Sequence, residues 1–254
     1  MGMGRAELAE HVISEITAGM TAQGYSVSEP LDNQPSAEPG VRVPSWRTLW
    51  FTHAERGIQG RTTAAVSAIV AASQQTGGVR IEGYAYLLSQ ALEEVLRGVP
   101  DTALDSSYRP GNTYAQRNYV DMAGFGSLEN PPKSDLTFHI VALGVGDGVE
   151  RFMDGTRRGV VDFFAERDSL MKLVDLALRE RAQDRGWPAP SRFRGVVVLC
   201  LLEGRVDDAV GLMDRYLSWE KYKRSDSRDR VVAFDSVLCE RFPDYALARS
   251  NRVE

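Results

Sequence analysis

Hydrophobic residues near the N-terminus recur at every fourth position: Leu8, Val12, Ile16 and Met20. This spacing places them on one face of a helix, which we expect over residues 5–23. Gly24 supplies the stop, because glycine readily adopts the left-handed backbone that ends many helices. Residues 29–44 contain four prolines and are therefore expected to form a loop or a mobile linker.

The next three apolar segments have the character of strands. Residues 46–54 are rich in aromatic and β-favouring side chains. Residues 61–73 are ambiguous, because their alanines favour a helix whereas their valines, isoleucine and threonines allow a strand. The short connection that contains Gly57 and Gly60 favours a hairpin between these two segments. Residues 79–86 are a candidate for the third strand.

A helical pattern follows over residues 86–97, and Gly98 and Pro100 are expected to end it. Residues 101–133 are polar and repeatedly interrupted by glycine and proline. They predict a long loop with one short element near residues 119–122. Loops of this length are uncommon in compact domains unless they bind something or are mobile.

The clearest strand prediction covers residues 136–145, which are apolar almost throughout. We expect this strand to be central and covered on both faces. From residue 149 onwards the pattern is helical, and five helices are expected, at residues 149–164, 167–185, 192–203, 207–222 and 229–242. Asp168 or Ser169 is suited to cap the second of them, and Pro243 is expected to end the last.

Together these elements predict an α+β fold. It consists of an N-terminal helix and a small, mostly antiparallel sheet, followed by a C-terminal helical hairpin or bundle. The expected organisation is an α+β part over residues 1–147, with mobile segments near 29–44 and 101–133, and a helical part over residues 148–254. One continuous domain describes the same pattern equally well.

Residues 202–210 read LEGRVDDAV, and they are followed by Leu212, Tyr216 and Leu217. This stretch resembles a single helical hairpin of the tetratricopeptide repeat family, over residues 193–219. In that family a glycine closes the first helix, and a small residue stands where the two helices approach most closely; Gly204 and Ala209 match these features. Because no second copy is present, the resemblance implies a local hairpin, with a repeat-like binding surface as the alternative. It implies no functional residue.

The composition changes this picture little. The chain has 254 residues, of which 43% are hydrophobic and 26% charged, and its net charge of −5 argues mildly against a polyanionic partner. No signal peptide is recognised, and no apolar stretch has the length of a membrane span. We therefore expect a cytoplasmic protein without membrane association. The two cysteines, Cys200 and Cys239, lack CxxC spacing and are expected to be reduced.

A glycine-rich stretch offers one route to catalysis or nucleotide binding. Gly144, Gly146 and Gly148 follow a predicted strand and precede a predicted helix, where backbone amides can hold a phosphate group. An enzyme or nucleotide-binding domain that uses Gly144–Gly148 together with His139 is therefore one alternative. The spacing is GxGxG, which matches neither the GxGxxG of dinucleotide sites nor a P-loop. A tight turn between strand and helix explains it equally well.

The three histidines, His11, His53 and His139, lie in none of the spacings typical of zinc sites. His53 and His139 fall in predicted strands of the same sheet, and either could act as a base that Asp121 or Asp135 orients. A hydrogen-bonded structural histidine is the more common case. The sequence thus predicts no metal, no cofactor and no assigned catalytic residue.

Tyrosines and arginines alternate in residues 106–119, which we name the Tyr/Arg segment: Tyr108, Arg109, Tyr114, Arg117 and Tyr119. These two residue types are the ones that most often anchor protein interfaces. Our leading hypothesis is therefore a non-catalytic interaction or accessory protein. It would be of the immunity or regulatory type, which fits a bacterial source. It would bind another protein through the Tyr/Arg segment or through the C-terminal helical face.

Nucleic-acid binding is the second alternative, through a basic cluster at residues 221–230: Lys221, Lys223, Arg224, Arg228 and Arg230. Asp226 and Asp229 are interspersed among these residues, and the chain as a whole is acidic. A nucleic-acid partner is therefore less favoured than a protein partner. The sequence pattern assigns no oligomeric state.

Overall fold

The computed structural model describes residues 4–28, 46–72, 78–104, 118–128, 139–142, 145–178, 190–218 and 226–252. The chain divides into two compact units. Unit 1 consists of Met1–Gly57, Thr63–Leu87 and Met122–Ala165, and unit 2 consists of Ile58–Thr62, Leu88–Asp121 and Glu166–Glu254. The chain thus passes between the units several times. The division into an α+β part (residues 1–147) and a helical part (residues 148–254), or their union in one continuous domain, stays a prediction.

Unit 1 begins with helix α1, which spans Arg5–Ala22. The Glu7 carboxylate accepts a hydrogen bond of 2.8 Å from the Gly4 amide and so closes the first turn. Gly24 follows the helix with a φ of 85°, in the left-handed region that favours glycine. The predicted apolar face is confirmed, since its four residues are all buried: Leu8, Val12, Ile16 and Met20.

The described residues form six strands in one sheet, and the fold is α+β as expected. The strands are β1 (Ser26–Ser28), β2 (Trp46–His53), β3 (Thr63–Ala72), β4 (Val79–Leu88), β5 (Tyr119–Gly124) and β6 (His139–Ala142). Their order is β1-β2-β3-β4-β5, and β6 pairs with β4. The pairings β1–β2, β2–β3 and β4–β6 are antiparallel.

The ambiguous segment after Gly60 is a strand, and the predicted hairpin is confirmed. Strand β3 pairs with β2 in a register that runs from Trp46 opposite Ala71 to His53 opposite Ala64. Both faces of β3 are buried in its central part, including Val66 on one face and Ser67 on the other. Alanines fit such a doubly covered strand because they are small, so packing outweighs their preference for helix.

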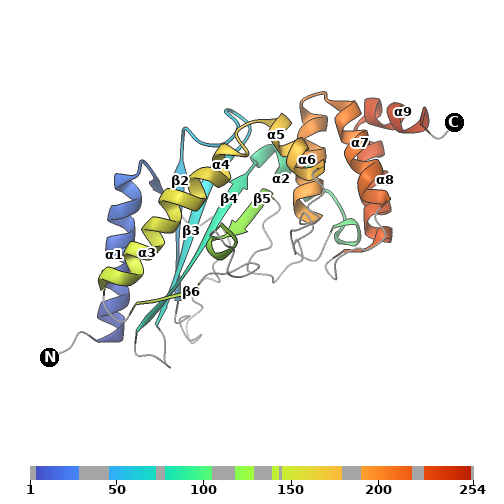
Figure 1. The fold of residues 1–254 in the computed structure, drawn as a ribbon. Helices are drawn as coiled ribbons and strands as arrows, with labels where there is room; N and C mark the ends of the chain where they lie inside the picture. The colour runs from blue at the N-terminus through green and yellow to red at the C-terminus, as the bar shows by residue number, and fades with distance from the viewer. Residues whose placement is uncertain are drawn as a thin grey trace. The chain divides into compact units, whose positions relative to one another are not determined.

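Helices cover one face of this sheet. Helix α3 (Val145–Gly155) continues through a π-helical turn (Thr156–Val160) into α4 (Val161–Ala165). Helices α1 and α3 lie side by side, and α1 packs against β3 (Figure 1). The expected aromatic residues of this stretch are buried in the core: Phe152, Phe163 and Phe164.

One phenyl ring in this core lies directly against backbone. Phe125 begins the 3-10 turn η3 (Phe125–Leu128) and stacks on Phe152 with ring centroids 4.9 Å apart. A Cβ atom added at Gly83 would stand 2.6 Å from the Phe125 ring, and one at Gly155 would stand 2.9 Å from it. Strand β4 and helix α3 therefore both need glycine where the ring passes.

Three sequence-based expectations are wrong, two of them boundaries and one the position of a strand in the sheet. The predicted strand 136–145 ends too late, because Val145 is already the first residue of α3. It was also expected to be central, whereas β6 lies beside β4 off the main strand order of the described residues. The helix expected from residue 86 starts later, as α2 (Gln90–Arg97), because β4 continues to Leu88. The Ser89 hydroxyl then caps α2 by accepting from the Leu92 amide at 3.3 Å.

Unit 2 is mainly helical. Besides α2 it contains the 3-10 turn η1 (Asp101–Ala103), α5 (Leu170–Leu178), α6 (Pro190–Leu202), α7 (Val206–Leu217), α8 (Arg228–Arg241) and α9 (Pro243–Ser250). Pro243 does not end the helical part but begins α9, since proline suits the first turn of a helix. Helices α6 and α7 pack together, with Gly204 at φ 68° between them and Ala209 buried. The likeness of this hairpin to a tetratricopeptide repeat stays a prediction.

The approach of Phe125 to Gly83 can be tested by adding one methyl group. We expect Gly83→Ala to lower the free energy of unfolding by about 1–3 kcal/mol, because the stacked ring has to move. The control is Gly211→Ala in α7, where an added Cβ would meet nothing within 4 Å. It is expected to stabilise the protein by up to about 1 kcal/mol. Urea unfolding of both variants measures the difference, and an unchanged midpoint for Gly83→Ala would contradict the packing.

Candidate functional site

The Tyr/Arg segment is anchored in unit 2 at both of its ends. Four of its five named residues, Tyr108, Arg109, Tyr114 and Arg117, lie outside the described residues. Before the segment, Leu104 follows η1 and is 1% exposed. Tyr119, the last residue of the segment, opens β5 and is 2% exposed. Tyr119 therefore serves the packing of unit 2, whatever the other four residues do.

The C-terminal anchor is fixed by backbone contacts. The Ser89 amide donates to the Asn118 carbonyl oxygen at 2.9 Å, directly before β5. A Cβ atom added at Gly195 would stand 2.9 Å from the Val120 Cα and 3.1 Å from the Tyr119 carbonyl oxygen. The backbone of α6 therefore packs directly against the backbone of β5. The segment thus returns to the fold at a tightly packed position.

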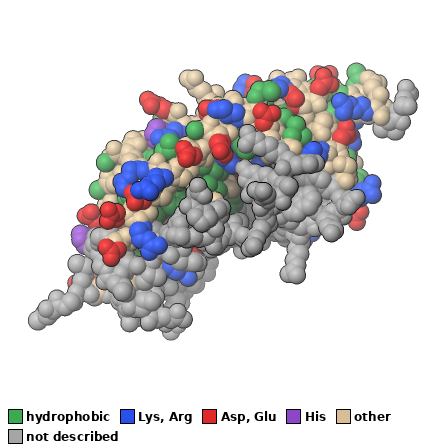
Figure 2. Space-filling view, in the orientation of Figure 1, with side chains coloured by type: hydrophobic (Ala, Val, Ile, Leu, Met, Phe, Trp, Pro, Cys, Tyr) green, Lys and Arg blue, Asp and Glu red, His purple; other side chains and the backbone are tan. Residues whose placement is uncertain are grey.

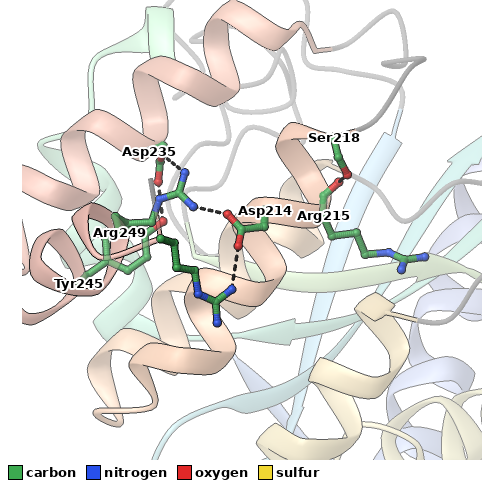
Figure 3. Close-up of polar contacts among 7 residues, drawn as sticks. Asp214, Arg215, Ser218, Asp235, Tyr245 and Arg249 are labelled. Carbon is green, nitrogen blue, oxygen red and sulfur yellow. Dashed lines mark hydrogen bonds and ion pairs between the residues drawn. The ribbon is translucent and has the colours of Figure 1, made fainter. Parts of the chain in front are cut away.

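The C-terminal helical face, formed by α7, α8 and α9, is cross-linked by one arginine (Figure 3). Arg249 on α9 pairs with Asp214 on α7 and donates to Asp235 on α8 at 2.8 Å. The Tyr245 hydroxyl also donates to Asp235, at 2.5 Å, and burial together with that bond raises the pKa of Tyr245. Arg252 adds a second contact to Asp214, at 2.8 Å. These bonds fix the three helices relative to one another within unit 2.

Large hydrophobic side chains are exposed mainly on the helices of unit 2: Met171, Leu178, Leu202, Val232 and Leu247. Val27 on β1 is the exposed example in unit 1. Leu247 on α9 is 63% exposed and Val232 on α8 is 46% exposed. Single exposed hydrophobic residues are common, but a rigid helical surface that displays several is typical of an interaction face.

A second polar network lies in the interior of unit 2. Arg194 on α6 is fully buried, and its guanidinium binds the Asp226 carboxylate twice, at 2.7 and 3.0 Å. The Tyr216 hydroxyl on α7 bonds to both groups. The guanidinium carbon also lies 5.2 Å from the centre of the Phe234 ring. Our sequence analysis missed this network, although an arginine inside the apolar run of residues 193–202 signals a buried ion pair.

Asp121, considered above as an orienter for a histidine, is held instead by two arginines. Its carboxylate is buried and lies 2.7 Å from the Nε atoms of both Arg167 and Arg192. Burial alone would raise the pKa of this carboxyl, but the charges and hydrogen bonds of Arg192 and Arg167 outweigh burial and lower the pKa. The arrangement is structural, since it keeps Asp121 ionised and fully engaged.

The groups considered for catalysis are not brought together. His53 stands opposite Ala64 on β3 and His139 opposite Glu82 on β4, so strands β3 and β4 separate β2 from β6. Asp135 lies outside the described residues. Burial raises the pKa of Cys200 to about 12 and also raises the pKa of Cys239, so both thiols stay protonated at neutral pH.

The glycine-rich stretch belongs largely to helix α3. Gly146 and Gly148 lie in the first turn of this helix, and Gly144 lies outside the described residues. Strand β6 ends at Ala142 and α3 begins at Val145, so only two residues stand between strand and helix. Phosphate binding at Gly144, Gly146 and Gly148 stays a prediction.

The basic cluster at residues 221–230 is described only from Asp226 onwards. Arg228 is exposed and Arg230 partly exposed, whereas Asp226 is buried against Arg194 and belongs to the interior. The sequence pattern suggested that Asp226 offsets the positive charge of this surface. Because Asp226 is buried, it does not. On the face drawn in Figure 2, basic and acidic side chains are intermixed over the coloured part of the molecule.

Comparisons of the chain with protein-family models, with curated proteins and with solved structures give no match. Within the ranges that the structure describes, no three His, Cys, Asp or Glu side chains are grouped as a metal site would require. No helix in those ranges combines the length and apolar character needed to cross a bilayer. The functional argument therefore rests on the geometry of the chain itself.

Removal of one side of the Arg194–Asp226 pair should be strongly destabilising. We expect Arg194→Ala to lower the free energy of unfolding by about 3–5 kcal/mol, because it leaves a buried carboxylate without its guanidinium. The double variant Arg194→Met with Asp226→Leu removes both charges and should lose much less. Chemical unfolding of the three proteins tests this. A double variant that is as unstable as the single one would show that the ion pair does not govern the effect.

The lowered pKa of Asp121 predicts a pH dependence. The ionised carboxylate stabilises the fold above the unfolded pKa of about 3.9, and this stability is lost as the pH falls through the lower folded pKa. Asp121→Asn should therefore cost about 3 kcal/mol or more at neutral pH. Its deficit relative to the natural chain should begin to shrink below about pH 4 and continue to shrink as the pH falls through the lower folded pKa, where the carboxyl of the natural folded chain also becomes neutral. Urea unfolding as a function of pH measures the deficit, and a deficit independent of pH would refute the assignment.

Proposed function

We propose that this chain is a non-catalytic protein that binds another protein, an accessory or regulatory component in the broad sense. Its contact surface is either the Tyr/Arg segment, with Tyr108, Arg109, Tyr114 and Arg117, or the C-terminal helical face. Tyr119 takes part as the buried anchor of the segment. The proposed partner is a protein rather than a nucleic acid or a membrane.

The observation that carries this proposal is the anchoring of the Tyr/Arg segment. Its first described neighbour, Leu104, and its last residue, Tyr119, are both buried in the same unit. Binding residues are often placed on loops that a rigid scaffold positions. The Tyr/Arg segment is connected to such a scaffold at both ends. Its tyrosine and arginine side chains are the typical hot spots of protein interfaces.

The helical face contributes a second, independent argument. Leu247 and Val232 are exposed although Arg249 holds their helices firmly in place. A preorganised apolar surface loses little conformational entropy when a partner covers it. Asp214 and Asp235 on this face are engaged by Arg249, Arg252 and Tyr245, which favours a docking role over a role in proton transfer.

The test is affinity capture from a lysate of the source cells, with quantitative mass spectrometry of the retained proteins. We expect one protein to be retained in stoichiometric amount by the natural chain. The double variant Tyr114→Ala with Arg117→Ala should retain at least about tenfold less, since each hot-spot side chain contributes about 2 kcal/mol. Leu247→Asp tests the helical face in the same way.

The matched control is Arg158→Ala, which removes a largely exposed arginine from unit 1 whose nearest acidic contact is Asp154 at 3.7 Å. It should retain the partner as the natural chain does. Equal retention by all variants would exclude both proposed surfaces. Retention of a nucleotide or small metabolite without any protein would refute the proposed function and favour the Gly144–Gly148 alternative.

A further inference from the structure

A cluster of polar side chains lies in unit 1 where β1 and β2 meet. Tyr25 directly precedes β1, and His53 is the last residue of β2. Their rings contact edge to face, with centroids 4.9 Å apart. The turn after β2 brings in Glu55 and Arg56, and the Arg56 amide donates to the His53 carbonyl oxygen at 3.5 Å. The antiparallel pairing of the two strands therefore gathers these groups in one corner.

The backbone fixes which nitrogen of His53 holds the proton. The Glu55 amide donates to Nδ1 of His53 at 3.3 Å, so Nδ1 acts as an acceptor and the neutral ring has its proton on Nε2. Gly24, at φ 85°, leaves room on that side, because a Cβ atom there would stand 3.2 Å from Nε2. His53 is thus a hydrogen-bond donor through Nε2.

Two further donors of this corner are buried without an acceptor. The Tyr25 hydroxyl and Nε of Arg56 are both inaccessible to solvent, and neither finds a hydrogen-bond partner among the described residues. Tyr25 as a whole is 3% exposed. A buried unsatisfied donor costs about 1–3 kcal/mol. Two of them need an explanation where one belongs to the residue whose ring contacts His53 and the other to the residue whose amide binds the His53 carbonyl oxygen.

We propose that Tyr25, His53 and Arg56 form a binding site for a small oxyanion, that is, a phosphate or carboxylate group. One such group supplies several acceptor oxygens and a negative charge, and it satisfies the three N–H and O–H donors together. Arg56 supplies the positive charge, and its planar guanidinium suits both types of oxyanion. This site is separate from the proposed protein-binding surface and does not depend on it.

The electrostatics of the corner favour the binding of an anion. Burial and then the charge of Arg56 lower the pKa of His53, and only the exposed Glu55 opposes them. Burial raises the pKa of Tyr25, and the charge of Arg56 partly offsets that increase. Arg56 is thus close enough to act on both rings. An anion bound here would stabilise the imidazolium form and raise the pKa of His53.

The experiment is an NMR titration of the His53 ring proton on Cε1 with inorganic phosphate and, separately, with acetate at constant ionic strength. His53→Gln assigns the resonance among the three histidines. We expect a saturable shift and an upward displacement of the His53 pKa on addition of anion. A response to phosphate alone identifies a phosphate site, and a response to both anions identifies a general oxyanion site. The absence of any shift with either anion overturns the proposal.

Variants distinguish a specific anion-binding site from nonspecific ionic screening. Arg56→Gln should abolish saturation, and Tyr25→Phe should weaken binding about tenfold. The control Arg47→Gln removes an exposed arginine that pairs with Glu10, and it should bind as the natural chain does. Equal responses from Arg56→Gln and the natural chain would refute the site, as would equal losses in Arg56→Gln and Arg47→Gln.

Tyr25→Phe also answers whether the hydroxyl lacks a partner. In anion-free buffer this variant should be as stable as the natural chain or more stable, because an unsatisfied buried group is removed. Phosphate should then raise the melting temperature of the natural chain but not that of Tyr25→Phe. A variant that melts earlier without anion would mean that the hydroxyl is already bonded inside the protein, and the proposal would fall even if Arg56→Gln failed to fold.

Discussion

Helix α6 places an arginine where the neighbouring positions are hydrophobic, and the arrangement of unit 2 depends on how that charge is satisfied. Arg194 has no exposure to solvent, so its guanidinium must find an anion inside the protein. Asp226 supplies the carboxylate from just before α8, and Tyr216 supplies a hydroxyl from α7. Hydrophobic burial has no preferred direction, whereas a bidentate ion pair does. The pair therefore selects one arrangement of three helices among those that would bury similar apolar area.

The same device recurs in this arginine-rich chain. Arg249 binds carboxylates on α7 and α8, and Asp121 binds the guanidinium groups of Arg167 and Arg192. A planar guanidinium can serve two acceptors at fixed angles, which lysine cannot do. Arg194 and Asp226 are buried in this way, whereas Arg249 and Asp214 stay partly exposed.

The parts of the fold that the sequence predicted are those set by local pattern. The α1 face follows from four-residue spacing, and the hairpin of β2 and β3 follows from a short glycine-containing turn. The side position of β6 depends on tertiary context, so local pattern misplaced it. Pro243 was misread for a local reason, because proline can follow one helix and also begin the next. The sequence predicted neither the buried Arg194 network nor the corner formed by Tyr25, His53 and Arg56. Nothing near Arg194 in the sequence points to Asp226, and only the pairing of β1 with β2 brings Tyr25 to His53.

The contrast between the two units is the strongest argument for a ligand in unit 1. Where the fold uses a buried arginine structurally, as at Arg194 and Arg167, it supplies a carboxylate within 2.7 Å. At Arg56 the buried Nε has no acceptor among the described residues, and the nearby Tyr25 hydroxyl has none either. The unbonded Nε alone does not single out Arg56, because Nε of Arg192 and Nε of Arg194 also make no hydrogen bond to a described residue, although both side chains pair with carboxylates. What distinguishes this corner is that the buried Tyr25 hydroxyl near Arg56 also has no hydrogen-bond partner among the described residues. The missing acceptor is best understood as one that comes from outside the chain, and an oxyanion has both the charge and the geometry to provide it.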